Sequence, residues 1–346
     1  MTTLPSSLPA APWALVSIER QDRAAPIRYS PVWGLGLLAL LALVAVAMSH
    51  LVAVSYVLLC IGLGVGVRQW AGVAPRFQSG VLWDERLQRS AVVLAGAQMA
   101  GVWMHLSLRL LLTLGLQVVL VLTLVTWAGR SLGLGRRLAQ MLGLGTAICG
   151  VTAIVAYARH SDASDEEVSA ASSVILIFGL LSFLLFPILG KWMGLSALAF
   201  GAWAGLAINN TSECIAAGAL WGPVSEVTAI LVKSVRTLFL VPALTWLQRS
   251  SPKEENAPRP KVPSFLWGFA AMGLLAALDW IPTAWAGPLS AASRSLFALG
   301  FVGIGLRTSF AGLSRVPRRT WVLGILAQLL IAVIALGAVR SGWAPR

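Results

Sequence analysis

Long apolar runs separated by short polar connections fill residues 32–339 of the chain. A helix that spans a bilayer needs about 20 mostly apolar residues. The runs that approach this length lie at residues 33–49, 52–67, 91–105, 110–128, 138–158, 168–189, 195–215, 224–247, 265–281, 289–310 and 321–339. The first two runs adjoin and the third is short, so the pattern predicts an all-α membrane protein with about ten or eleven spanning helices.

Lys and Arg residues concentrate in every second connection between these runs. If the N-terminus is cytoplasmic and every run crosses, the basic residues outside the runs that fall on the outer side are Arg109, Arg159, Arg340 and Arg346. Cytoplasmic loops of membrane proteins carry such an excess of positive charge. The charge pattern therefore predicts a cytoplasmic N-terminus and a periplasmic C-terminus.

Composition agrees with a membrane location. Of 346 residues, 58% are hydrophobic and 11% are charged, which is more apolar surface than a soluble core hides. The net charge of +13 would suggest nucleic acid in a soluble chain, but here the basic residues lie in short loops and we expect no nucleic-acid partner. Cys60, Cys149 and Cys214 lie singly in apolar runs, so we expect no disulfide, no metal and no cofactor.

Glycines interrupt two of the runs. The fifth run contains GLGTAICGVTAIVAYA (residues 143–158) and the tenth contains SLFALGFVGIGLRTSF (residues 295–310). If runs two to six and seven to eleven form two units of opposite orientation, the glycine-rich run is the fourth in each unit. Matching interrupted helices are typical of inverted-repeat transporters, so we expect two discontinuous helices with a substrate site where they meet. The alternative is that these glycines only allow unbroken helices to pack closely.

This organisation divides the chain as follows. We expect a cytoplasmic tail at residues 1–30, an extra spanning helix at 31–50, a first repeat at 51–190, a second repeat at 191–340 with a cytoplasmic linker at 248–263, and a C-terminal tail at 341–346.

Two cations lie deep in the eighth run. Lys233 and Arg236 are three residues apart, share a helix face, and fall near the middle of a core about 30 Å thick. Each costs about 2.5 to 3.5 kcal/mol at that depth unless a partner or a water-filled cavity receives it. They either line the pathway of an anion or are neutralised by a buried carboxylate and by the carbonyls of the broken helices.

Polar residues also close the seventh run, which ends in INNTSEC at residues 208–214. Asn209, Asn210 and Glu213 are either part of a helix end that frays into the outer loop or part of a site. Glu226 follows Pro223 in the first turn of the eighth run, where the helix dipole favours an acid.

Three segments resemble a known family. GTAICGVTAIVA (residues 145–156), ILVKSVRTLFLVP (230–242) and ALGFVGIGLRTSF (298–310) are similar, in this order, to signatures of the bacterial inner-membrane proteins assigned as sulfate exporters. The resemblance extends over residues 32–339. It implies the inverted-repeat fold shared with cation-proton antiporters and bile acid symporters, an anionic substrate, and a location in the bacterial inner membrane.

The resemblance also implies which residues bind substrate. The positions that match the motifs are Thr146, Cys149, Gly150, Thr152, Lys233, Arg236, Gly303, Gly305 and Thr308. Where many members have a His followed by an acid, this chain has Asn209 and Asn210, and an acid follows only at Glu213. Proton coupling has therefore either moved to Glu213 or is absent.

These observations predict a secondary transporter that exports sulfate or a related oxyanion by alternating access. A sodium or proton antiporter of the same architecture is the first alternative, with Glu213 or Glu226 carrying the ion. A membrane scaffold without transport is the second. We expect no enzyme, because no Ser/His/Asp set, HExxH or P-loop is present. The expected partners are a small anion, a proton or sodium ion, and the lipid bilayer, and a homodimer is left open.

Overall fold

The computed structural model describes residues 30–52, 54–98, 108–158, 161, 163–249, 263–308, 313 and 316–342. Within these ranges the secondary structure is helical, with no strand. Six helices are long and apolar enough to cross a membrane: Val32–Leu51, Leu108–Ser131, Asp165–Trp192, Pro223–Leu247, Ala284–Arg307 and Arg318–Arg340. The prediction of an all-α membrane protein is confirmed at this level.

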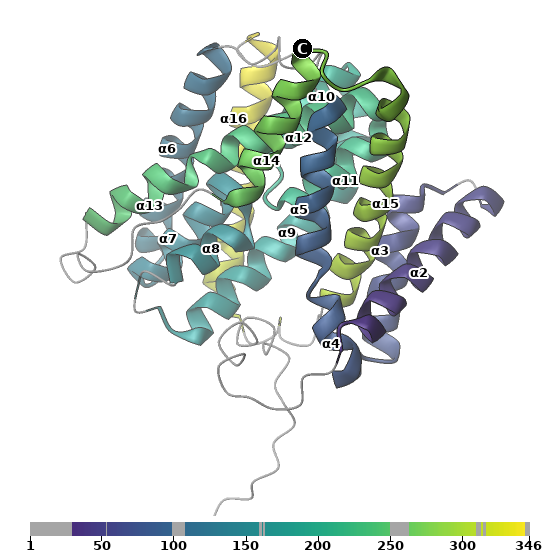
Figure 1. Ribbon diagram of the computed structural model, residues 1–346. Helices are drawn as coiled ribbons and strands as arrows, with labels where there is room; N and C mark the ends of the chain where they lie inside the picture. The colour runs from purple at the N-terminus through teal and green to yellow at the C-terminus, as the bar shows by residue number, and fades with distance from the viewer. Residues whose placement is uncertain are drawn as a thin grey trace, which may run out of the picture.

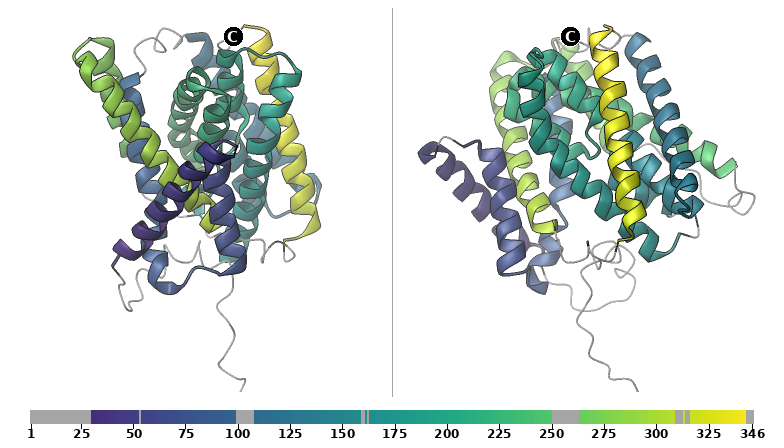
Figure 2. Two further views of the ribbon diagram at one scale, coloured as in Figure 1. Left: turned by 90° about the vertical axis from the view of Figure 1, so that its right-hand side faces the viewer. Right: turned by 180° about the vertical axis from the view of Figure 1, so that it is seen from behind.

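The described helices form two bodies, each of which packs mainly within itself. The first, here called the frame, contains α2 (Val32–Leu51), α3 (Tyr56–Trp70), α4 (Pro75–Val81), α5 (Asp84–Ala95), the short helix Gly96–Gln98, α14 (Ser264–Ala277) and α15 (Thr283–Arg307). In Figure 1 and the right view of Figure 2, α2 lies at the outer edge of the molecule.

The second body, here called the hairpin body, holds the centre of the chain. It contains α6 (Leu108–Ser131), α7 (Arg136–Leu144), a π-helical turn (Gly145–Cys149), α8 (Val151–Ala158), α9 (Asp165–Trp192), α10 (Ala197–Ala207), α11 (Thr211–Trp221), α12 (Pro223–Leu238), α13 (Leu240–Arg249) and α16 (Arg318–Arg340). The contacts between the two bodies run from α3, α5 and α15 to α11 and α12.

The tenth run does not form a discontinuous helix, and this prediction is wrong. α15 is continuous over Thr283–Arg307, although it contains Gly300, Gly303 and Gly305. These glycines lie where neighbouring helices approach most closely. A Cβ atom on Gly305 would lie 2.3 Å from the carbonyl oxygen of Ile61, and one on Gly303 would lie 2.2 Å from Cβ of Asp84. The glycines of α15 therefore serve helix packing.

The fifth run is interrupted, but it folds back on itself where we expected it to continue across the membrane. The hydroxyl of Tyr157 in α8 donates to Oε1 of Gln140 in α7 at 2.6 Å, across 17 positions of the chain. A Cβ on Gly145 would lie 3.2 Å from the side chain of Ile154. Two helices in line could not make these contacts, because the rise is about 1.5 Å per residue. We call α7, the π-helical turn and α8 the first hairpin.

The seventh run, which we predicted as one helix, is a second hairpin of α10 and α11. The rings of Phe200 and Trp221 stack with centroids 4.1 Å apart, so the start of α10 lies beside the end of α11. Between them, Ile208 is extended and ends α10, and α11 begins at Thr211. Ser196 caps α10 by accepting from the backbone N–H of Ala199 at 3.1 Å.

The two hairpins enter the molecule from opposite ends, as their contacts with different parts of α16 show. Gly129, directly before the first hairpin, lies against Leu323 near the start of α16. Trp203 in the second hairpin donates through Nε1 to the carbonyl of Ala332, in the second half of α16, at 3.0 Å. In Figure 1 the second hairpin accordingly lies toward the end marked C and the first toward the other end.

Candidate functional site

The tips of the two hairpins meet inside the hairpin body. Gly150, at the tip of the first hairpin, has a φ of 68°. A Cβ at this position would lie 1.7 Å from Oδ1 of Asn210, which stands at the tip of the second hairpin. Oδ1 of Asn210 accepts from the backbone N–H of Val151 at 3.1 Å. Only glycine has both the φ and the space that this contact requires.

Lys233 reaches both tips from α12. Its side chain is 0% exposed, and its ammonium donates to the carbonyl of Ile148 in the first hairpin at 3.1 Å and to that of Ile208 in the second at 2.7 Å. It also donates to the carbonyl of Asn209. An ammonium has three N–H donors, so these bonds use all of them.

Arg236, one turn further along α12, bridges the same two hairpins. It donates through Nε to the carbonyl of Ala147 at 2.7 Å and through Nη2 to that of Thr146. Through Nη1 it donates to carbonyls of the second hairpin, including that of Leu206 at 2.8 Å. Both cations thus donate to carbonyl groups at the C-terminal ends of two helical segments. One segment is α7 with its π-helical turn, and the other is α10.

This arrangement matches part of one of the two that we considered for Lys233 and Arg236, neutralisation by a buried carboxylate and by carbonyls of the broken helices: the carbonyls are there, but among the described residues no carboxylate forms an ion pair with either cation. The carbonyl groups at the C-terminal end of a helix lack intrahelical partners, and lipid cannot supply any. Two amides complete the set: Gln117 of α6 donates to the carbonyl of Leu206 at 2.6 Å, and Gln328 of α16 donates to that of Ala207 at 3.4 Å. We did not predict either amide, although each is an isolated Gln in an apolar run.

The second halves of the hairpins begin at the same place. α8 starts at Val151 and α11 starts at Thr211, so two helix N-termini lie beside the cations. Thr152, in the first turn of α8, is exposed, and Ser212, in the first turn of α11, is half-buried. The Ser212 hydroxyl donates to Oε1 of Gln88 in α5 and so joins the hairpin body to the frame.

Glu213 is buried beside these N-termini. Its Oε1 accepts from Nδ2 of Asn210 at 3.0 Å, and both atoms lie close to Gly179 of α9. In the described part of the chain, Oε2 of Glu213 and Oδ1 of Asn209 have no hydrogen-bond partner. Two buried acceptors at the hairpin tips therefore have unused capacity for a proton or a cation.

The structure brings most of the predicted site residues together and separates three. Thr146, Cys149, Gly150, Thr152, Asn209, Asn210, Glu213, Lys233 and Arg236 all belong to the hairpin tips or to the face of α12 that contacts them. Gly303, Gly305 and Thr308 lie in or just after α15 of the frame, where the carbonyl of Thr308 accepts from Gln69 at 3.4 Å. No group of His, Cys, Asp or Glu side chains suited to a metal ion occurs among the described residues.

A short sequence repeat begins before each of the two hairpins and extends into it. Residues 129–135 read GRSLGLG and residues 190–196 read GKWMGLS. Both form the same helix-ending turn: Gly133 and Gly194 have φ angles of 77° and 65°, and Leu134 and Leu195 donate to the carbonyls of Gly129 and Gly190. Further on, GTAI at residues 145–148 matches GLAI at 205–208.

The repeat explains the symmetry of the cation contacts. Ile148 and Ile208 occupy equivalent positions of the two copies, and Lys233 donates to the carbonyl of each. One unit, a long helix followed by a hairpin, therefore occurs twice in opposite orientation, as α6 to α8 and as α9 to α11. The predicted repeat boundary at residue 190 falls inside the second copy.

Comparison with known proteins gives a consistent result. A family model described as "Conserved hypothetical protein 698" matches residues 33–324. A UPF0324 membrane protein of Bradyrhizobium diazoefficiens is 30% identical over 83% of this chain and 84% of its own length, and one of Brucella melitensis is 31% identical over 80% of each chain. A UPF0324 membrane protein of Clostridium tetani is 30% identical over 63% of this chain and 70% of its own length. No solved structure matches.

Proposed function

The chain belongs to this family of UPF0324 membrane proteins, and from its two opposed hairpins we propose that it is a secondary transporter of a small anion. The observation that carries the proposal is the charge arrangement at the hairpin tips. It favours a transporter over a scaffold, because two opposed hairpins that bring helix N-termini together inside the molecule are typical of transporter sites, and a scaffold does not require them.

The charges at the tips favour an anion. Each helix end carries about half an elementary charge, positive at the N-terminus and negative at the C-terminus. The two C-terminal ends are offset by Lys233 and Arg236, whose donors are taken up by backbone carbonyls. The first turn of α8 contains no acid, so this N-terminus keeps its positive end, whereas Glu213 lies in the first turn of α11. N–H groups at helix N-termini bind anions. The anion is therefore proposed to contact the N-termini, with Thr152 and Ser212 beside it, while the cations hold the tips in place.

The two-body construction supports alternating access. The hairpin tips and α12 are tied together by the cations, so the hairpins move as one unit with α12. The frame contacts this unit through a small set of helices, and the hydrogen bond between Ser212 and Gln88 crosses that boundary. Movement of the hairpin body against the frame would expose the site to one side and then to the other.

The test is flux of radiolabelled sulfate into proteoliposomes, with the variant Thr152→Asp and its neutral control Thr152→Asn. An acid in the first turn of α8 is compatible with folding, since helix N-termini favour it, but it would occupy the positive end that the anion needs. We expect Thr152→Asp to abolish flux and Thr152→Asn to retain most of it. Equal flux in wild type and Thr152→Asp would contradict an anion site at this N-terminus.

A second candidate function rests on the unused acceptors of Glu213 and Asn209. They favour a sodium or proton antiporter, or coupling of the anion to one of these ions, with Glu213 as the carrier. Glu213→Gln keeps the shape and the bond to Asn210 but cannot release a proton. If the variant transports sulfate down its gradient but no longer responds to a pH or sodium gradient, Glu213 carries the coupling ion. An unchanged response would exclude that role.

The direction of transport, outward across the bacterial inner membrane with the N-terminus in the cytoplasm, remains part of the same proposal. The repeats of five runs at residues 51–190 and 191–340 likewise remain a prediction, because the duplication described above covers a shorter unit. Cysteine labelling from either side of the membrane at exposed positions such as Lys191 and Arg76 tests the orientation.

A further inference from the structure

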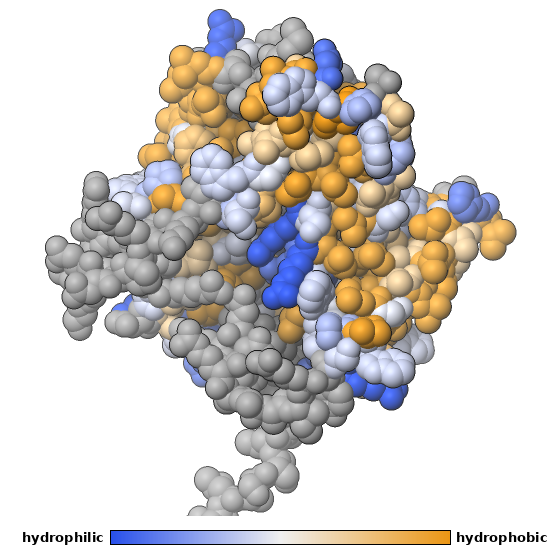
Figure 3. Space-filling model, viewed as in Figure 1, coloured by the Kyte–Doolittle hydropathy of each residue, from blue (hydrophilic) through white to orange (hydrophobic). Residues whose placement is uncertain are grey.

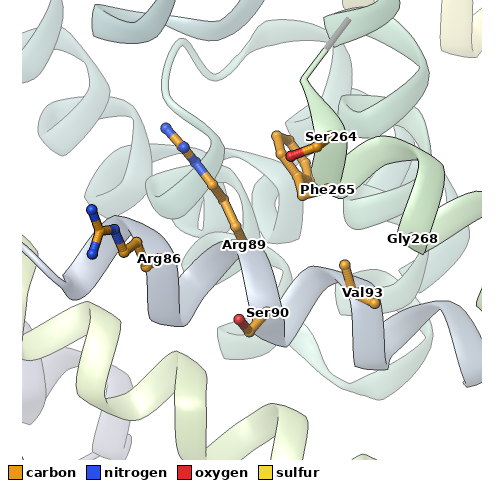
Figure 4. A pocket seen from close by; sticks show the side chains of 7 residues that line it. All are labelled: Arg86, Arg89, Ser90, Val93, Ser264, Phe265 and Gly268. Carbon is orange, nitrogen blue, oxygen red and sulfur yellow. The ribbon is translucent and has the colours of Figure 1, made fainter.

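A pocket of about 340 Å³ lies between α5 and α14, apart from the hairpin tips. Arg86, Arg89 and Val93 line it from one face of α5, at the spacing of successive helical turns, and Ser264, Phe265 and Gly268 line it from the start of α14. In Figure 4 the guanidinium groups of Arg86 and Arg89 project from the same helix, with Ser264 and Phe265 across from them. Figure 3 shows strongly hydrophilic residues gathered in the middle of this otherwise largely apolar face.

Contact between α5 and α14 bounds the pocket on one side. α5 and α14 run parallel and touch beyond it, where a Cβ on Gly268 would lie 3.0 Å from Val93 and one on Gly96 would lie 2.7 Å from the carbonyl of Phe269. The two arginines lie toward the end at which both helices start. This is the end of the frame at which α4 lies (Figure 1).

Arg89 can leave its present partner without leaving a charge unpaired. Nη2 of Arg89 lies 3.0 Å from Oε2 of Glu85. The other oxygen of Glu85 lies 2.9 Å from Nη1 of Arg307, which also pairs with Asp84 at 3.1 Å. If Arg89 turns to an incoming anion, Arg307 continues to neutralise Glu85.

Arg86 is held in a different way. Its guanidinium lies over the ring of Trp83, 4.7 Å from the centroid, and it has no carboxylate within ion-pair distance among the described residues. The side chain is exposed. Stacking on an aromatic ring positions the guanidinium while leaving its N–H groups available for an oxyanion.

The pocket is joined to the hairpin tips through α5. Gln88, adjacent to Arg89 in the chain, accepts from Ser212 at the N-terminus of α11. Pocket and central site therefore lie on either side of the same helix.

The geometry points to an oxyanion-binding vestibule: Arg86 and Arg89 bind a tetrahedral or carboxylate oxyanion in this pocket before it passes to the N-termini of α8 and α11. This inference rests on the proposed function and names the substrate class as an oxyanion that accepts several hydrogen bonds, since a guanidinium fork matches such a group and gains nothing specific from a halide. The same chemistry is found in the headgroup of an anionic phospholipid.

Chemical labelling tests the pocket without requiring transport. Phenylglyoxal modifies accessible arginines, and peptide mass spectrometry gives the rate at each position in the purified protein. We expect sulfate to slow labelling of Arg86 and Arg89 severalfold relative to chloride at equal ionic strength. Arg76 is the matched control, because it is exposed and stacks on Phe77 at 4.8 Å in the same way; its rate should not change. If each of the three arginines is labelled at the same rate in sulfate as in chloride, the inference is overturned.

A second arm separates the two sources of the anion. The labelling is repeated without sulfate in nanodiscs of phosphatidylcholine and in nanodiscs that contain phosphatidylglycerol. Protection by phosphatidylglycerol and none by sulfate would identify a lipid site and overturn the vestibule. In proteoliposomes, Arg86→Gln should raise the KM for sulfate about tenfold with kcat unchanged, as expected for loss of one charge-assisted contact, whereas Arg76→Gln should not.

The outcomes also distinguish this inference from the proposed function. Protection of Arg86 and Arg89 by sulfate together with unchanged flux in Thr152→Asp would support the pocket and reject the central site. Loss of flux in Thr152→Asp without protection would support the central site and reject the pocket.

Discussion

Two glycine-rich segments of similar composition fold differently in this protein. Residues 143–150 end in a helix break at Gly150, whereas residues 300–305 belong to the continuous helix α15. The difference lies in what surrounds each segment. Lys233 and Arg236 donate to the carbonyls that the break at Gly150 releases, while α15 packs against the α3 and α5 helices at its glycines.

The comparison teaches that glycine permits a break but does not cause one. A break inside a membrane releases backbone groups that lipid cannot satisfy, so it persists only where protein groups or a cavity satisfy them. The second hairpin shows that a break can also form without glycine. Its turn at Ile208, Asn209 and Asn210 contains no glycine, yet it is broken because the cations and two amides receive its carbonyls.

The largest effect is expected when a cation that donates to the carbonyl groups of the hairpins is removed. Arg236→Met leaves carbonyls of both hairpins without a donor, and each unsatisfied buried group costs about 1 to 3 kcal/mol. We expect loss of most folded protein, measured as the monodisperse fraction in size-exclusion chromatography. Lys191→Met, at the exposed end of α9, is the control and should purify like wild type. Normal yield and melting temperature for Arg236→Met would show that the cation does not hold the hairpins together.

The second largest effect is expected at the tip itself. Gly150→Ala places a Cβ 1.7 Å from Oδ1 of Asn210 in a residue with a φ of 68°, which should destabilise the protein by about 2 to 5 kcal/mol. Asn210→Gly removes Oδ1 and also the two hydrogen bonds of the Asn210 side chain, so the clash is isolated within that background. Gly150→Ala should lower the melting temperature less in the Asn210→Gly variant than in wild type, because only the backbone strain remains. An equal decrease in both backgrounds would show that the clash contributes nothing.

A smaller effect is expected in the frame. Gly305→Ala places a Cβ 2.3 Å from the carbonyl of Ile61, so α15 and α3 must separate slightly. The backbone of α15 is helical there, and only overpacking is introduced, which costs about 1 to 3 kcal/mol. Thermal unfolding in detergent measures the loss. A Gly305→Ala variant less stable than Gly150→Ala would reverse the ranking of the two glycine-rich segments.

The sequence alone predicted the helical class, the interruption at Gly150 and the need of Lys233 and Arg236 for partners inside the protein. It did not predict the hairpins, because hydropathy measures the length of an apolar run and not whether the run turns back. The tally of basic residues could not detect them either. When the fifth and seventh runs fold back, only the two ends of α9 change sides, so Lys191 moves to one side and the connection with Arg159 to the other, and the balance is unchanged.

The short repeat was the signal that could have located the second break. Gly129 to Gly135 and Gly190 to Ser196 end their helices in the same way, and the GxAI segments at residues 145–148 and 205–208 follow at almost equal distances. Pairing the fifth run with the seventh by this repeat, and not with the tenth by glycine content, would have predicted a break near Asn209. The contacts of Gly303 and Gly305 depend on the neighbouring helices and could not be read from their own run.

The smallest effect is expected at Gly66 of α3, two residues after Gly64, which packs closely against α15. Gly64 of α3 lies where a Cβ would be 2.4 Å from the carbonyl of Val302, whereas Gly66 has no neighbour within 4 Å of that position. Ala is favoured over Gly in a helix interior by about 1 kcal/mol, so Gly66→Ala should leave the melting temperature unchanged or raise it slightly, and Gly64→Ala should lower it. Thermal unfolding of the two variants under one condition isolates the contact, because helix, residue type and depth are nearly the same. If both variants lower the melting temperature equally, the role of these glycines is backbone flexibility and not close packing, and the distinction between the two segments fails.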